Sequence, residues 1–89
     1  MPLLLVAYDL NKPEQDHTEL LEQIKRYSNV RLTESSFAII TDETPKTVCG
    51  KLNKFINNGD NIYVITLKRP YDTCKPNLAS DWLNKELTQ

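Results

Sequence analysis

The 89-residue chain has few of the sequence features that indicate a metal centre, a disulfide framework or a membrane span: it has little cysteine and histidine and no long apolar run. Its two cysteines, Cys49 and Cys74, fit no metal-binding spacing, which predicts free thiols in a reducing compartment. The single histidine, His17, is expected to be exposed, with a general-base role as the alternative. The longest apolar run falls far short of the roughly 20 residues that cross a bilayer, and we recognise no signal segment. We therefore expect a cytoplasmic protein without a membrane partner.

The chain also lacks an excess of positive charge, because its net charge is −1. This balance argues against a strong electrostatic grip on nucleic acid. The charges are unevenly placed: residues 1–45 carry four basic and eight acidic side chains, a net −4, and residues 46–89 carry seven and four, a net +3. The second half either presents a weak basic face or is a solvated mixed surface.

What the sequence does contain is an apolar stretch at residues 3–7 that ends in Tyr8 and Asp9. A run this apolar, of strand length, predicts a strand buried on both faces. Asp9 then lies at the rim of the core, where the chain must turn before Pro13. A carboxylate at this position either binds a metal ion or caps the loop that follows.

The rest of the chain alternates between helical and extended patterns. Asp16 and Glu19 have the spacing of a capping box, which predicts a helix that ends near residues 27–29. Two strands joined tightly around residues 33–36 follow, and Thr44-Pro45 then starts a second helix that stops at residues 57–59. One stripe on that helix is apolar: Val48, Leu52, Phe55 and Ile56.

The last strand is predicted at residues 61–68, before a loop over residues 69–77 and a helix over residues 78–89. That terminal helix is expected to bring four apolar side chains together: Leu78, Trp82, Leu83 and Leu87. We thus expect one domain over residues 1–89, with its core in residues 1–68.

The order strand, helix, strand, strand, helix, strand predicts an α+β fold of ferredoxin-like type. In this fold a four-stranded antiparallel sheet has two helices on one face, and here a C-terminal helix is added. The other face, or the edge of the last strand, is expected to be closed by a second copy of the chain. We therefore predict a homodimer whose two-fold axis brings equivalent residues together.

Several short motifs resemble the Cas-two family, the small ferredoxin-like proteins of CRISPR adaptation that are related in fold to the VapD toxins. They are Tyr8-Asp9, Lys25-Arg26-Tyr27, Ser36-Phe37 and Ile62-Tyr63-Val64-Ile65. The amino-acid sequence is more similar to a branch labelled SinR family at residues 8–13, 35–37, 58–61 and 81–83. That label borrows the name of a helix-turn-helix regulator, which the strand patterns of this chain contradict.

The resemblance implies a role for Asp9. In the Cas-two family the matching aspartate of both protomers holds a divalent metal, which gives some members a nuclease activity, and other members are non-catalytic scaffolds. Two hypotheses follow. The chain is a non-catalytic dimeric binding module that holds a nucleic-acid or protein partner in a bacterial or mobile-element defence setting. Alternatively it is a Mg²⁺-dependent endonuclease for RNA or single strands, with Asp9 as the metal ligand and catalytic residue.

The other candidate site residues are three lysines and two aromatic residues. Lys46, Lys51 and Lys54 lie at helical spacing and form either a phosphate-binding track or a solvated face. Phe37 is expected to fill the core or a dimer interface. Trp82 is too large to leave exposed and packs either on its own sheet or across a dimer.

Overall fold

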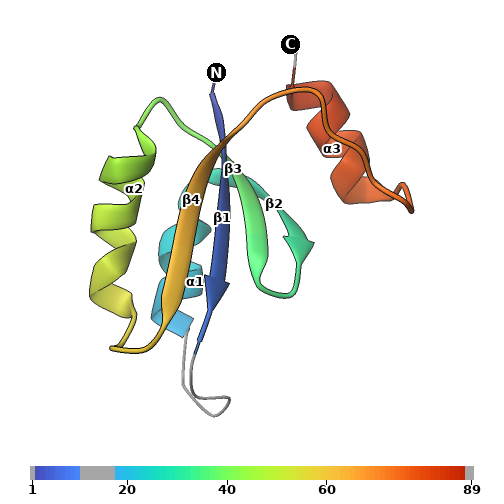
Figure 1. Ribbon diagram of the computed structural model, residues 1–89. Coiled ribbons are helices and arrows are strands. Elements are labelled where there is room, and N and C mark those ends of the chain that lie inside the picture. The colour runs from blue at the N-terminus through green and yellow to red at the C-terminus, as the bar shows by residue number, and fades with distance from the viewer. Residues whose placement is uncertain (1, 11–17, 88–89) are drawn as a thin grey trace.

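Four antiparallel strands form the framework of the structure, a computed structural model that describes residues 2–10 and 18–87 (Figure 1). The sheet order is β2-β3-β1-β4, the arrangement of a ferredoxin-like α+β fold, as predicted. The elements are β1 (Leu3–Asp9), α1 (Thr18–Ile24), β2 (Ser28–Thr33), β3 (Ser36–Ile40), α2 (Pro45–Leu52), the 3₁₀ turn η1 (Asn53–Phe55), β4 (Asn61–Leu67) and α3 (Leu78–Glu86).

The first strand is an inner strand of the sheet. Leu3 lies opposite Ile40 of β3 on one side and opposite Leu67 of β4 on the other. Because strand side chains alternate between the two faces, β1 contributes to both of them. Leu4, Val6 and Tyr8 point toward one face; Leu3, Leu5, Ala7 and Asp9 point toward the other.

The first face is closed by α1 and α2. Leu20 and Ile24 of α1 and Val48 and Leu52 of α2 are fully buried against the sheet. The sheet contributes Leu4, Val6, Tyr8, Phe37 and Ile39 to this main core. In Figure 1, α1 lies behind β1 and β4, so the two strands face the viewer.

The second face is covered only in part, by α3. Leu83 of α3 and Leu87, the residue that caps its C-terminus, pack on Leu3 and Ala38, with Trp82 partly buried beside them. Arg69, in the loop before α3, donates hydrogen bonds to the carbonyl oxygens of Leu87 at 3.1 Å and Asn84 at 3.3 Å. A cation at the C-terminal end of a helix also interacts favourably with the helix dipole. These contacts hold α3 over one part of the sheet.

Local sequence signals account for several element boundaries. Thr44 caps α2, since its Oγ1 accepts a hydrogen bond from the N–H of Thr47 at 3.1 Å, and Pro45 occupies the first helical position. A tight hairpin joins β2 and β3, as predicted, with the Thr33 and Ser36 hydroxyls 2.7 Å apart. Gly59 has a φ of 91°, the left-handed conformation that favours glycine.

Three expectations were wrong. The first helix does not reach residues 27–29: α1 ends at Ile24, and β2 begins at Ser28. The second helix does not run to residue 57: α2 ends at Leu52, and η1 follows, so the predicted apolar stripe is split between a buried helical part and the half-buried Phe55 and Ile56. Leu78 does not join the apolar group of α3, because it is the first helical residue and is 85% exposed. The predicted cap at Asp16 and the loop at residues 11–15 lie outside the described residues.

The burial of Phe37, which is 1% exposed, predicts a large effect of its removal. We expect Phe37→Ala to lower the free energy of unfolding by about 3–5 kcal/mol, because a cavity replaces the ring. Urea denaturation followed by circular dichroism measures it. The matched control is Leu78→Ala, which should change stability by less than about 0.5 kcal/mol. Equal effects of the two substitutions would contradict the core placement of Phe37.

Candidate functional site

Part of the second face of the sheet has no helix over it. We call it the open face and define it by Leu5, Ala7 and Asp9 of β1 and by Tyr63 and Ile65 of β4. Tyr63 is 64% exposed and Ile65 is 50% exposed, although both are large apolar residues in the middle of a strand. In the sheet they lie opposite Ala7 and Leu5 respectively, so the exposed side chains form one continuous apolar area.

Asp9 lies at the rim of the open face, at the end of β1 and opposite Asn61 of β4. Its side chain is exposed. No hydrogen bond or ion pair joins this carboxylate to another residue that the structure describes. Within residues 2–10 and 18–87, no three His, Cys, Asp or Glu side chains gather as a metal-binding group. One chain thus offers one carboxylate here, and the predicted magnesium site stays a prediction that needs a second copy.

The open face continues into a groove of about 290 Å³ between the sheet and α3. Apolar side chains make most of its wall: Leu5, Leu32, Leu67, Tyr71, Leu83 and Leu87. Tyr71 fixes the far wall, because its hydroxyl donates to the Ser80 carbonyl oxygen at 3.3 Å. The groove widens the apolar area that a partner molecule could cover.

A second candidate site lies on the helical layer, on the other side of the sheet. We call it the cationic pocket, a hollow of about 400 Å³ lined by Gln23, Arg26, Tyr27, Lys51, Leu52, Lys54 and Phe55. Two of the three predicted lysines, Lys51 and Lys54, therefore lie together, whereas Lys46 does not line the pocket. Arg26, which follows α1, joins them.

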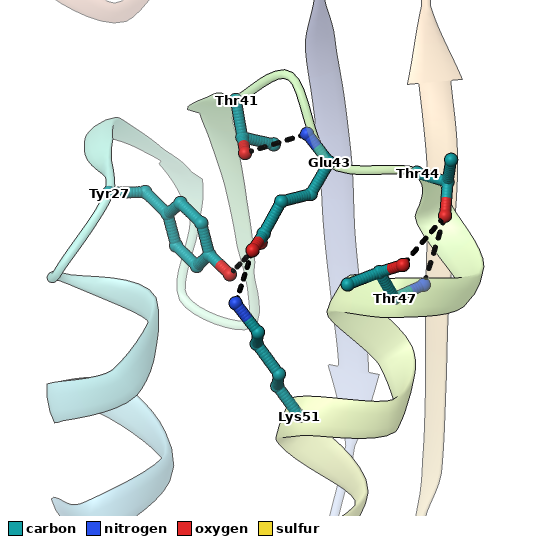
Figure 2. Close-up of polar contacts among 6 residues, drawn as sticks. All are labelled: Tyr27, Thr41, Glu43, Thr44, Thr47 and Lys51. Carbon is teal, nitrogen blue, oxygen red and sulfur yellow. Dashed lines mark hydrogen bonds and ion pairs between the residues drawn. The ribbon is translucent and has the colours of Figure 1, made fainter.

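The carboxylate of Glu43 joins two residues that line the cationic pocket, Tyr27 and Lys51 (Figure 2). Tyr27, in the turn after α1, donates a hydrogen bond to Oε1 of Glu43 at 2.6 Å. Lys51 of α2 forms an ion pair with Oε2 of the same carboxylate. The loop before α2 places Glu43 there, because the N–H of Glu43 donates to Oγ1 of the buried Thr41 at 3.0 Å while Thr44 caps the helix.

These contacts change the pKa of the Glu43 carboxyl and of the Tyr27 hydroxyl. The hydrogen bond from Lys51, followed by that from Tyr27, holds the pKa of the Glu43 carboxyl below its ordinary value. Burial raises the pKa of the Tyr27 hydroxyl to about 12, and the hydrogen bond to Glu43 adds to this rise. At neutral pH the Tyr27 phenol is therefore neutral and the Glu43 side chain is a carboxylate.

The structure describes the positions of the remaining predicted residues except His17. Phe37 belongs to the main core, and Trp82 packs on its own sheet beside Leu83. Cys49 and Cys74 are free thiols, as predicted. His17 lies outside the described residues.

Comparison with protein-family models, with curated proteins and with solved structures finds no match for this chain. In the part of the chain that the structure describes, no helix has the length and apolar character needed to cross a membrane.

The lowered pKa of Glu43 predicts a pH-dependent stability difference between the wild type and Glu43→Gln. Since the folded-state pKa lies below the ordinary value of about 4.3, the contribution of the carboxylate is complete above that pH. It is lost as the pH falls through the folded-state pKa. Urea denaturation at a series of acidic pH values should therefore show the wild type and the variant converging. Tyr27→Phe is the control, because it keeps the ion pair with Lys51; a pH-independent difference for Glu43→Gln would contradict the bridge.

Proposed function

We propose that this chain is a non-catalytic, homodimeric binding module of Cas-two type, which holds a nucleic-acid or protein partner in a bacterial or mobile-element defence setting. The observation that supports the dimer is the open face, with Tyr63 and Ile65 exposed in mid-strand. Apolar patches of this kind on small domains are typical of interaction surfaces.

A second copy of the same chain suits the open face. A two-fold axis through the face would place the Tyr63 side chain of each protomer against the partner's sheet, in an isologous interface. The net charge of −1 sets up little repulsion between two copies. A domain of 89 residues also buries a smaller share of its surface on folding than a larger domain does, about 60–65%, so burial of an apolar interface adds to its stability.

The oligomeric state tests this proposal. Sedimentation velocity over a range of concentrations should show a dimer for the wild type. We expect Tyr63→Ser and Ile65→Ser each to weaken dimerisation by about tenfold or more, because each removes a large apolar side chain worth about 1.5–3 kcal/mol on burial. Leu78→Ser is the matched control: it also removes a large exposed apolar side chain, but from α3. A wild type that is monomeric throughout, or an equal effect of the control, would refute the open-face dimer.

The alternative function is a Mg²⁺-dependent endonuclease, and the position of Asp9 supports this hypothesis. The carboxylate is exposed on the face that the proposed dimer covers, so two copies would bring two such carboxylates to one interface. Mg²⁺ binds oxygen ligands at about 2.1 Å, often with one or two carboxylates, and it can activate water and neutralise a phosphate. Asp9 of each protomer would hold the ion.

Asp9→Asn separates the two functions. Wild type and variant are incubated with labelled RNA and DNA in Mg²⁺, Mn²⁺ or EDTA. For the binding module we expect no metal-dependent cleavage by either protein. Cleavage that requires metal and disappears in Asp9→Asn would instead establish the endonuclease. Cleavage that is equal in both proteins would indicate a contaminating enzyme, and sedimentation of Asp9→Asn verifies that the dimer is unchanged.

A further inference from the structure

The cationic pocket gathers positive charge that is far apart in the sequence. Arg26 follows α1, Lys51 belongs to α2 and Lys54 belongs to η1, yet all three line one hollow. The carboxylate of Glu43 offsets one of these charges through its ion pair with Lys51. A chain with a net charge of −1 thus presents a local excess of positive charge on its helical layer.

The bridge at Glu43 shows which chemistry two of the lining side chains, Tyr27 and Lys51, bind. One carboxylate oxygen accepts from a phenol and the other from an ammonium group, so an oxyanion is already held between α1 and α2. A phosphate offers acceptor oxygens of the same kind and carries its own negative charge. Arg26 and Lys54 are exposed and can donate to such a group at the mouth of the pocket.

The pocket also has an apolar wall, made by Leu52 and the half-buried ring of Phe55. A flat aromatic side chain beside cationic groups is the combination that binds unpaired nucleotides, since every base has a face that can stack on a ring. Bases in a duplex are already stacked and cannot reach into a hollow of this kind. The lining therefore favours a single strand over a duplex.

We infer that the cationic pocket binds the backbone of single-stranded nucleic acid, with Arg26, Lys51 and Lys54 on phosphates and Phe55 against a base. Glu43 acts there as an internal competitor, because it neutralises Lys51 until a phosphate approaches. This inference deepens the proposed function and rests on it for nucleic acid as the partner. The pocket lies on the helical layer, so closing the open face of the sheet leaves it accessible.

Binding of a fluorescently labelled single-stranded RNA, of the DNA of the same sequence and of the matching duplex tests the inference. Fluorescence anisotropy is measured at several salt concentrations. Three phosphate contacts predict a slope of log K against log salt of about −2 for a single strand. Lys54→Gln and Arg26→Gln should each reduce the slope by about 0.7 and weaken binding about fivefold.

Lys46→Gln is the matched control, because Lys46 is a lysine of α2 that does not line the pocket. It should leave the affinity within about twofold of the wild type. Glu43→Gln should tighten binding by about threefold, since it removes the competing charge. Phe55→Leu should weaken binding about tenfold with an unchanged salt slope, because stacking carries no counterion release.

Three results would overturn the inference: an equal loss for Lys46→Gln and Lys54→Gln, tighter binding of the duplex than of the single strand, or no binding at low salt. Sedimentation of each variant keeps this test separate from the proposed dimer. A monomer that binds single strands through the pocket would refute the dimer and support the pocket. A dimer that does not bind them would refute the pocket alone.

Discussion

The inner position of β1 in the sheet is the constraint on which the rest of the structure depends. This strand pairs with β3 and β4 at once, so two of the other three strands are positioned directly against it. Its alternating side chains also supply both apolar layers, with Leu4 and Val6 under α1 and α2 and Leu3 under α3. A one-residue shift of register would exchange these two sets and expose the larger core, because the side-chain period of a strand is two. The position of Asp9 follows from the same register.

The two layers differ in how completely they are closed, and this difference separates the two proposed binding surfaces. The helical layer is finished by α1 and α2, and its outer surface carries the cationic pocket. The opposite layer has one helix, held at its C-terminal end by Arg69, which leaves the middle of β4 uncovered. A surface for self-association and a surface for an anionic ligand can therefore coexist without competing. If both are used, a dimer carries two pockets on its outer sides, and one long strand that reaches both gains from the high effective concentration of the second.

The fold was predictable because its signals are local, whereas the pocket was not because it is made by tertiary contacts. The cap at Thr44 acts over a few residues and is confirmed, and Gly59 has the left-handed φ of 91° that favours glycine in a turn. The length of α2 was overestimated, since apolar spacing at Phe55 fits a 3₁₀ turn as well as a helix. The sequence spacing of Lys51 and Lys54 could be read as a track on one helix, but Arg26 joins them only once α1 and α2 pack side by side. Sequence periodicity carries no information on such tertiary contacts between helices.

The sheet order also has a consequence for synthesis of the chain on the ribosome. The partners of β1 are the third and fourth strands, and the pairing of Leu3 with Leu67 joins residues near opposite ends of the chain. The apolar first strand therefore emerges long before β4 can cover its edge. Contacts between residues so far apart in the sequence slow folding. An apolar strand is prone to aggregate until its partner strand is synthesised and pairs with it. The acidic surplus of residues 1–45, close to this strand in the chain, supplies like charges that keep nascent or newly released copies apart during that interval.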